Sequence, residues 1–362
     1  MRILLSFLSI LTFATLAGEM RVFENGKDGY VAYRIPALIT AANGDILAFA
    51  EGRKNGSGDT GDIDLVLRRS TDAGRTWGPQ QIVWDDDANT CGNPCPVVDG
   101  ETGAIHLLLT WNPGAEHEKA IRSGKAQLGR RPFYTASNDH GATWAKPTDI
   151  SAHADRPEWG WYATGPGRGI QLTRSAHAGR LVIPANHSRA DGTYDAHSLL
   201  SDDGGRSWRI GAALGDGANE SCVAELTDGS IVFNTRMQTH SQGQRATARS
   251  ADGGEKWTPL AHEKALPCPR CEGSILRWSF AAGTTKSVLL FCNPAGPGRS
   301  NITLRASLDE GATWPHSRLL FADKSPGYTA LTRLAGDEIG VLHETASGIA
   351  LQSIALSELV GE

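Results

Sequence analysis

The sequence predicts an all-β fold, a six-bladed β-propeller, from three observations. An eight-residue pattern, Ser-x-Asp-x-Gly-x-Thr-Trp, recurs five times at intervals of roughly 50 to 70 residues, which is the length of one four-stranded blade with its loops. A β-rich run precedes each copy. The composition, with 42 Gly and 10 Trp, favours short strands and tight turns over long amphipathic helices. The five copies, called box turns below, are residues 70–77, 137–144, 201–208, 250–257 and 307–314.

Each box turn has a local physical explanation. Its Asp carboxylate accepts nearby backbone N–H groups, and the Gly two residues later supplies the positive φ that the reversal needs. The Trp is expected to begin the next strand and to pack the turn against its own hairpin. A calcium loop is the alternative, but one Asp per turn supplies too few oxygen ligands. Each box turn is therefore interpreted as the hairpin between two strands of one blade.

The number of box turns sets the expected number of blades. Five box turns and a final stretch without one predict six blades, closed by pairing of the N-terminal and C-terminal strands. No Pro/Ser-rich linker marks a second domain. We therefore expect residues 18–362 to form a single propeller.

The first residues have the layout of a secretory signal peptide. Arg2 gives a positive start, residues 3–17 are almost entirely apolar, and Thr15 and Ala17 offer small residues at a cleavage site. The run is too short to span a bilayer. It predicts a signal peptide over residues 1–17 and a secreted or periplasmic protein after cleavage near Ala17. A buried N-terminal helix or an uncleaved anchor is the alternative.

The charge and cysteine content of the chain indicate which macromolecules, disulfides and metal ions to expect. The net charge of −5 is scattered along the chain, so neither nucleic acid nor an anionic membrane is an expected partner. Export would permit disulfides, and Cys91 with Cys95 and Cys268 with Cys271 are candidates, although the sequence does not fix connectivity. A single CxxC without a second pair or nearby histidines is weak support for a metal site. We expect a monomer with neither metal nor cofactor.

Function has to come from the segments between the box turns, since such turns occur in propellers of several functions. Two early segments are Tyr33-Arg34-Ile35-Pro36 and Phe49-Ala-Glu51-Gly-Arg53, followed by an acidic loop at 57–64. Later segments lie at 219–236, 293–303 and 327–344. Together these motifs resemble the sialidases (neuraminidases), retaining exo-α-glycosidases that release terminal sialic acid. The resemblance extends along the whole mature chain.

The resemblance implies roles for six residues. Sialic acid carries a carboxylate on its anomeric carbon, and three converging guanidiniums would bind it through charge-assisted, partly bidentate hydrogen bonds that lysine cannot reproduce. A carboxylate nucleophile would be repelled there, and a Tyr nucleophile is the known sialidase exception to the two-carboxylate rule. A free Tyr has a pKa of about 10 and needs a base and a cationic field. The expected roles are nucleophile for Tyr328, its base for Glu220, general acid/base for Asp59, and carboxylate binding for Arg34, Arg236 and Arg299.

Four further residues receive less defined roles from the resemblance. Arg53 and Asp62 are expected to line the sugar-ring end of the pocket. Glu118 matches another acidic pocket position, with a solvated loop carboxylate as the alternative. Glu344 is expected to hold Arg34 in position.

Two positions depart from the pattern of the resembled family. His343 stands where Tyr is usual and Glu272 where Gln is usual, and both changes are expected to affect pocket polarity or aglycone preference. Other matches without a defined role are residues 92–94, 110–112, 161–167 and 271–274.

The sequence predicts an exo-α-sialidase that hydrolyses terminal α-linked sialic acids from glycoproteins, glycolipids or oligosaccharides. One alternative is a hydrolase or trans-glycosidase for a related nonulosonic acid. Another is a glycan-binding propeller without catalysis, which would not need Tyr328, Glu220 and Asp59 together.

Overall fold

The computed structural model describes residues 19–361, and the chain in that range consists of β-strands with three short helices. The predicted signal peptide at residues 1–17 lies outside the described residues. None of the helices in the range 19–361 is long and apolar enough to cross a membrane. The helices are α1 (Glu118–Arg122), α2 (Ser151–Ala154) and α3 (Leu356–Val360).

Three sheets have four strands each, and one has five. The sheet ordered β1-β25-β24-β23 contains β1 (Met20–Glu24), β25 (Gly348–Ala355), β24 (Glu338–Thr345) and β23 (Thr329–Arg333). Two others follow chain order: β15 (Ala218–Glu225), β16 (Ile231–Met237), β17 (Gln244–Ser250), β18 (Ala261–Pro267), then β19 (Ser274–Ser279), β20 (Val288–Gly296), β21 (Ser300–Ser307), β22 (His316–Phe321). The five-stranded sheet contains β10 (Tyr162–Thr164), β12 (Leu181–Ser188), β13 (Tyr194–Ser201) and β14 (Arg209–Asp216), with β11 (Ile170–Gln171) on β12.

The remaining strands form one continuous sheet of eight. A single parallel residue pair, Ile63 with Thr90, joins β4 to β6. Its strands are β2 (Ala32–Thr40), β3 (Ile46–Arg53), β4 (Ile63–Ser70), β5 (Gln81–Trp84), β6 (Thr90–Val98), β7 (Ile105–Asn112), β8 (Arg131–Ser137) and β9 (Thr148–Asp149).

The all-β prediction is confirmed, but the prediction of six blades is wrong. The described strands give a four-bladed arrangement of separate four- or five-stranded sheets, together with the continuous eight-stranded sheet. The reason is that a box turn marks a hairpin within a sheet. The number of box turns does not show where backbone pairing joins one group of strands to the next. Such pairing joins β4 to β6 and merges two groups into one sheet.

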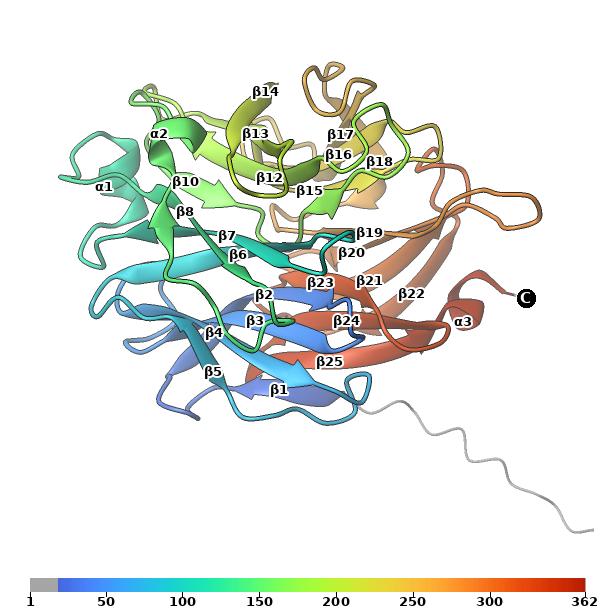
Figure 1. Cartoon of the computed structure of the whole chain (residues 1–362), viewed down its shortest axis with the longest axis horizontal. Coiled ribbons are helices and arrows are strands. Elements are labelled where there is room, and N and C mark those ends of the chain that lie inside the picture. The colour runs from blue at the N-terminus through green and yellow to red at the C-terminus, as the bar shows by residue number, and fades with distance from the viewer. Residues whose placement is uncertain (1–18, 362) are drawn as a thin grey trace, which may run out of the picture.

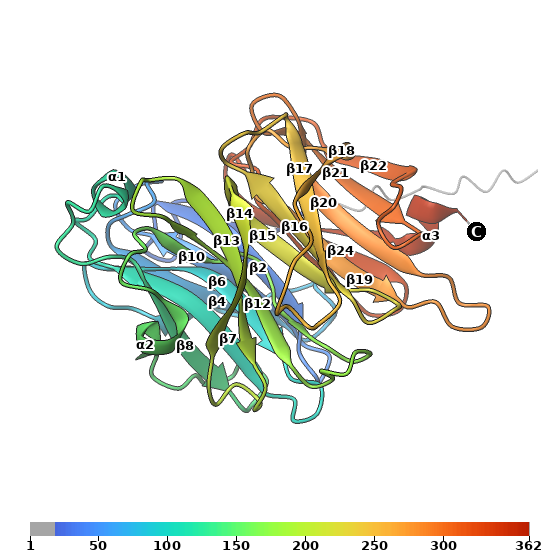
Figure 2. The ribbon, with the colours of Figure 1, turned by 90° about the horizontal axis from the view of Figure 1, so that it is seen from above.

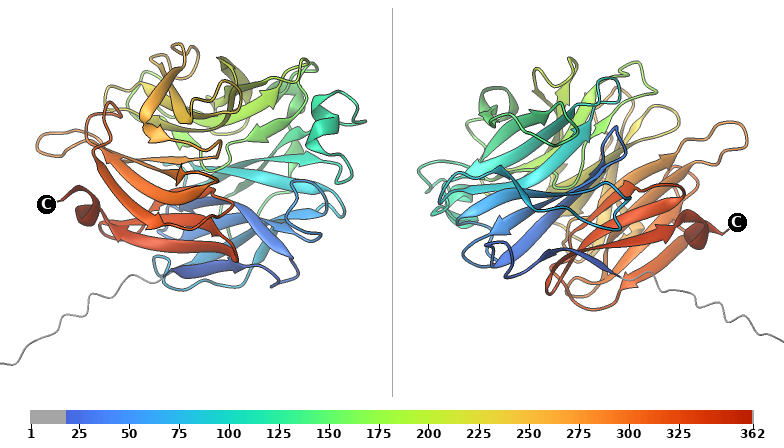
Figure 3. Two further views of the ribbon diagram at one scale, coloured as in Figure 1. Left: turned by 180° about the vertical axis from the view of Figure 1, so that it is seen from behind. Right: turned by 60° about the horizontal axis from the view of Figure 1, so that its bottom comes forward.

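The two ends of the described chain meet in one sheet, as predicted. β1 pairs antiparallel with β25, Met20 lying opposite Leu351 and Glu24 opposite Gly348. The sheets surround a common centre, so the first strands lie beside the last (Figure 1). The views from behind and below agree (Figure 3). Seen from above, α1 and α3 lie on opposite sides of the molecule (Figure 2).

The hydrophobic core lies between neighbouring sheets, as β20 illustrates. Its residues 288–291 are all apolar and buried. Because successive side chains point to opposite faces, Leu290 belongs to the same core cluster as Val341 of β24, whereas Leu289 and Phe291 belong to the cluster that contains Ala224 of β15. A strand covered on both faces shows no polar alternation. Burying each Leu or Phe stabilises the fold by about 1.5–3 kcal/mol.

The box turns form the expected hydrogen bonds. Ser70 Oγ donates to Asp72 and accepts from the N–H of Gly74, both at 2.8 Å, and Gly74 has φ +87°. Asp72 also accepts from the N–H and hydroxyl of Thr76, at 2.8 and 2.6 Å. The other four turns repeat this pattern with one change. Lys256 replaces the hydroxyl residue in the fourth turn, so only its backbone N–H reaches the aspartate.

The box tryptophans do not begin the next strands, contrary to the prediction. Each one precedes its strand; Trp257, for example, lies four residues before the start of β18 at Ala261. Their packing is nevertheless as expected. Trp257 and Trp314 meet Phe233 and Phe291 of their own sheets edge to face, with ring centroids 5.0 and 6.0 Å apart.

Two substitutions in the fourth box turn should change stability in opposite directions. Ser250→Ala removes the acceptor of the buried Gly254 N–H, 2.8 Å away, and should lower the free energy of unfolding by about 1–3 kcal/mol. Lys256→Thr restores the missing hydroxyl and should raise it by about 0.5–1 kcal/mol. Denaturant unfolding followed by tryptophan fluorescence measures both. Equal stability of the two variants would contradict this account.

Candidate active site

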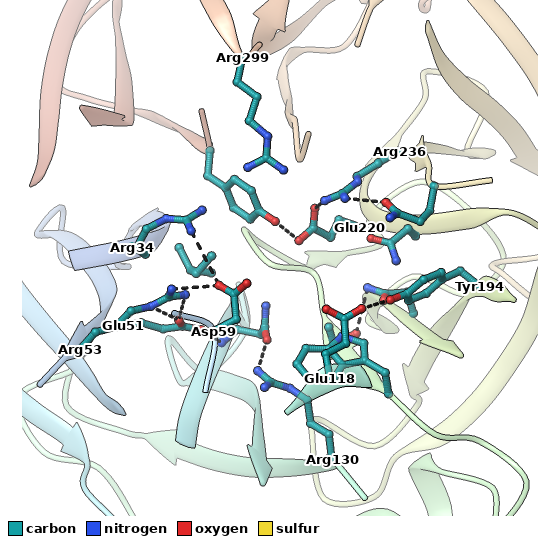
Figure 4. A pocket seen from close by; sticks show the side chains of 18 residues that line it. Arg34, Glu51, Arg53, Asp59, Glu118, Arg130, Tyr194, Glu220, Arg236 and Arg299 are labelled. Carbon is teal, nitrogen blue, oxygen red and sulfur yellow. Dashed lines mark hydrogen bonds and ion pairs between the residues drawn. The ribbon is translucent and has the colours of Figure 1, made fainter. Parts of the chain in front are cut away.

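One pocket, of about 160 Å³, lies where segments from all five sheets meet (Figure 4). Its lining is dominated by charged and amide side chains. The lining residues are Arg34, Ile35, Glu51, Arg53, Asp59, Asn93, Glu118, Arg130, Trp161, Ala163, Asn186, Tyr194, Asn219, Glu220, Arg236, Gln238, Arg299 and Tyr328.

Arg34, Arg236 and Arg299 all line the pocket, although they come from β2, β16 and the turn between β20 and β21. The guanidiniums of Arg34 and Arg299 lie over the ring of Tyr328, at 5.4 and 5.7 Å from its centroid, and that of Arg236 contacts Glu220, the partner of the Tyr328 hydroxyl. Arg299 donates to two backbone carbonyls, those of Pro326 at 2.8 Å and Arg270 at 3.2 Å. The structure thus brings together three cations that are far apart in the sequence.

An irregularity in β2 aims Arg34 into the pocket. The pairing register with β3 shifts between Arg34 and Ala37, where Pro36 has no N–H to donate. Ile35 takes φ +59°, a conformation that costs a non-glycine residue of order 1–3 kcal/mol. Its N–H donates to Glu344 at 2.9 Å, so the neighbouring sheet stabilises the strained residue.

Tyr328 and Glu220 form a hydrogen-bonded pair on the pocket floor, where the phenol donates to the carboxylate. The other Glu220 oxygen accepts from Arg236 at 2.5 Å. Burial and the charge of Glu220 raise the pKa of Tyr328, while Arg236 and Arg34 oppose that rise. The resting phenol is therefore protonated, with a carboxylate placed to accept its proton.

Asp59 lies on the loop at 54–62 and is the most accessible of the predicted catalytic groups, its side chain being 62% exposed. Its Oδ1 is 2.9 Å from Arg53 and 3.7 Å from Arg34. Partial removal from water would raise the pKa of Asp59, but the charges of Arg53 and Arg34 outweigh it and hold that pKa below its usual value. In the absence of substrate, Asp59 is an anion paired with two cations.

Arg53 is among the residues that line the pocket and is almost completely buried. It is paired at 2.6 Å with Glu51, a residue of the same motif for which the sequence predicts no role. Glu51 also accepts from the N–H of Asn93 at 2.9 Å. A Cβ on Gly92 would lie 2.1 Å from Glu51, so only glycine allows this close approach.

Glu118 reaches the end of the pocket away from the three arginines (Figure 4). It lies on α1, accepts a hydrogen bond from the Tyr194 hydroxyl, and is 3.8 Å from Arg122. Arg122 stacks on the Tyr194 ring at 4.4 Å. The structure therefore favours the pocket position of Glu118 over the solvated loop carboxylate.

Arg130 is a pocket residue that the sequence analysis missed. It is buried, lies 4.3 Å from the Trp161 ring, and donates to the neutral side-chain oxygens of Thr110, Asn112 and Asn93. Burial lowers its pKa to about 10. Its partners belong to the segments 92–94, 110–112 and 161–167, for which the resemblance defines no role and which here surround one cation.

Asp62 and Glu344 lie outside the pocket lining. Asp62, which was expected in the pocket, pairs instead with Lys54 at 2.9 Å. Glu344 is fully buried behind the pocket. It accepts from Arg34 Nε at 2.8 Å and from the N–H of Tyr328 at 3.0 Å, a placement that suits the expected positioning role.

The two departures, His343 and Glu272, also lie outside the pocket lining. His343 is fully buried, with its ring 5.6 Å from Phe321. Glu272 is buried and accepts from the N–H of Thr329 at 2.9 Å. Burial raises the pKa of Glu272 well above its usual value. Neither side chain changes the polarity of the lining directly.

The six cysteines are buried free thiols, so neither candidate pair is bridged. Among residues 19–361, no three His, Cys, Asp or Glu side chains gather as a metal site requires.

Comparisons with known proteins identify the family of the chain. Residues 44–343 match the family described as the BNR repeat-like domain. The exo-alpha-sialidase of Aspergillus fumigatus is 34% identical over 346 residues, which cover 88% of this chain and 79% of the relative. The chain belongs to the sialidase family. The predicted resemblance is thus confirmed.

Two other members of the sialidase family show how much of each protein is shared. The sialidase of Micromonospora viridifaciens is 37% identical over 363 residues, 95% of this chain, but the chain spans only 54% of that relative. The solved structure of the Hadza microbial sialidase Hz136 superposes with a TM-score of 0.83 at 32% identity. That match covers 92% of this chain and 68% of the solved one.

Glu272→Gln should stabilise the protein in a pH-dependent manner. The raised pKa of Glu272 means that the folded protein keeps a proton that the unfolded chain releases at neutral pH. This contribution to stability is complete below the unfolded pKa of about 4.3 and is lost as the pH rises above it. The variant's gain in melting temperature should be small near pH 4 and larger near pH 8.

Scanning calorimetry across this pH range measures the difference from the unsubstituted protein. Glu24→Gln, at an exposed position of β1, provides the matched control. A Glu272→Gln gain that does not increase with pH would contradict the protonated carboxyl.

Proposed function

We propose that this protein is an exo-α-sialidase that hydrolyses terminal α-linked sialic acids with retention of configuration. The observation that carries the proposal is the meeting of three guanidiniums from separate sheets around the hydrogen-bonded Tyr328–Glu220 pair. The family relatives named sialidases support it. We propose terminal sialic acids of glycoproteins, glycolipids or oligosaccharides as the substrate, and no cofactor.

The substrate carboxylate would bind between Arg34, Arg236 and Arg299. Planar guanidiniums match a carboxylate through charge-assisted hydrogen bonds. Binding there would place the anomeric carbon, which carries the carboxylate, close to the Tyr328 hydroxyl. The phenol is neutral, so it can approach a carbon beside a negative group without charge repulsion.

Glycosylation of the enzyme would start at Tyr328. Its oxygen bonds to the anomeric carbon while Glu220 accepts the phenolic proton. The bond from that carbon to the glycosidic oxygen breaks, and the oxygen receives a proton from Asp59. In the second step Asp59 takes a proton from water, and the water oxygen displaces Tyr328, which recovers its proton from Glu220. Two displacements at one carbon give net retention.

Substrate binding would also prepare Asp59 for its role as an acid. In the free protein Asp59 is ionised, 3.7 Å from Arg34. A substrate carboxylate on Arg34 would compensate that positive charge and weaken its hold on Asp59, raising the pKa of Asp59. Protonation of the acid would then follow binding of an anionic sugar.

The predicted signal peptide and propeller are consistent with this activity. We propose that a single catalytic domain over residues 18–362 acts outside the cytoplasm, where glycoconjugates are exposed, after removal of residues 1–17.

Purified protein should release fluorophore from an aryl α-sialoside. Tyr328→Phe removes the nucleophilic oxygen and should lower kcat/KM by at least about 100-fold, a loss of roughly 3 kcal/mol of transition-state stabilisation. Tyr134→Phe removes the same atom outside the pocket, where the hydroxyl contacts His106 at 2.8 Å, and should retain activity. Binding of sialylated glycans without turnover by the unsubstituted protein would identify a lectin.

The first product anomer tests the double displacement. Proton NMR during turnover should show α-sialic acid before mutarotation produces the β-anomer. Initial β-sialic acid would contradict retention, and accumulation of a sialylated acceptor or an anhydro sugar would show transfer in place of hydrolysis. Turnover confined to a deaminated nonulosonic acid would change the substrate but not the chemistry.

A further inference from the structure

The loop that carries Asp59 is anchored on its inner side mainly through backbone groups. Arg53 donates to the carbonyls of Ser57 and Gly58, at 2.5 and 2.9 Å. The Thr90 hydroxyl accepts from the N–H of Gly61 at 3.1 Å and donates to its carbonyl at 2.9 Å. The stretch between these anchors contains Asp59 and Thr60.

On the outer side, a histidine from another segment contacts the residue next to Asp59. The Nδ1 of His117 lies 2.7 Å from the hydroxyl of Thr60. His117 immediately precedes α1, within the segment 113–130 that connects β7 to β8. This hydrogen bond is exposed to solvent, and neither residue lines the pocket itself.

A close backbone approach brings these two segments together. Gly114 lies against the acid/base loop, and a Cβ at this position would be 2.8 Å from the carbonyl oxygen of Gly61 and 1.9 Å from that of Ala88. Glycine is therefore required where the segment crosses the loop. His117 lies three residues after Gly114, and Thr60 immediately precedes Gly61. Their hydrogen bond therefore joins two segments whose backbones are already in close contact.

Both ends of α1 contact the β12–β13 hairpin. Arg122, the last residue of the helix, donates to the carbonyl of Gly192 at 2.5 Å, and Glu118, its first residue, accepts from Tyr194. The segment thus spans from the acid/base loop to the connection between β12 and β13. Any group that holds Thr60 to α1 also fixes Asp59 relative to the far end of the pocket.

We infer that His117 and Thr60 are positioning residues for the acid/base, and that their hydrogen bond holds the Asp59 loop against α1 while the glycosidic bond breaks. This inference rests on the proposed function. Substrate carboxylate would take over Arg34, leaving Asp59 with Arg53 and its own backbone as restraints. Gly56 and Gly61, with φ +138° and +132°, add conformational freedom. A misplacement of about 1 Å can lower a catalytic rate by about 100-fold.

The test compares leaving groups, because only a poor leaving group depends strongly on protonation by Asp59. His117→Ala and Thr60→Val should lower kcat for a sialyl-oligosaccharide by about tenfold or more, with KM changing less than about twofold. With an activated nitrophenyl sialoside, kcat should fall less than about twofold. The double variant should lose no more than either single variant, since both remove one interaction.

Conservative substitutions separate this role from a general loss of structure. Thr60→Ser keeps the hydroxyl, and His117→Asn keeps a polar atom near the position of Nδ1, so both should retain most oligosaccharide turnover. His153→Ala, at an exposed histidine of α2, is the matched control and should behave like the unsubstituted protein.

Three results would overturn the inference. The first is unchanged oligosaccharide turnover in His117→Ala, and the second is an equal loss with both leaving groups. The third is a double variant whose loss is the product of the two single losses. Absence of turnover by the unsubstituted protein would instead reject the proposed function, and the positioning role with it.

Discussion

The pocket depends on one buried carboxylate, that of Glu344. It accepts hydrogen bonds from Arg34 Nε and from the backbone N–H groups of Ile35 and Tyr328, at 2.8, 2.9 and 3.0 Å. A buried charge is tolerated only where its hydrogen bonds are satisfied, and here three donors meet it. The same carboxylate therefore fixes Ile35 at the irregularity in β2, the side chain of Arg34 and the backbone of Tyr328. None of them can move independently of β24.

The charges around the pocket fit the anionic substrate proposed above. Three guanidiniums have carboxylate partners, whereas Arg299 donates to backbone carbonyls and Arg130 donates to neutral side-chain oxygens. Within residues 19–361, neither of these two is paired with a carboxylate, and they lie at opposite ends of the pocket, which the carboxylates of Asp59 and Glu118 also line (Figure 4). The paired guanidiniums are Arg34 with Glu344, Arg236 with Glu220 and Arg53 with Glu51.

Local features were predictable from the sequence, and features that depend on tertiary structure were less so. The box turns followed from Ser, Asp and Gly at fixed offsets, since their hydrogen bonds close within one turn. The arginines and Tyr328 were found because each lies in a distinctive motif. Arg130 was missed because its three partners come from two other strands. Asp62 lies on the same loop as Asp59 and was expected in the pocket. Side chains of one loop can point in different directions, and that of Asp62 forms an ion pair with Lys54 instead. The number of sheets could not be predicted, because the pairing of Ile63 with Thr90 joins two groups of strands into one sheet. Neither the hydrophobic pattern nor the box turns indicate this pair.

Closure of the ring by β1 and β25 has a consequence for synthesis on the ribosome. Met20 pairs with Leu351, more than 300 residues later, so β1 leaves the ribosome long before its partner exists. Until then the nascent chain carries unpaired strand edges, which readily pair with other chains. At typical synthesis rates of about 5–20 residues per second, that exposure lasts on the order of tens of seconds. The last strand to be made thus removes the edge left open by the first.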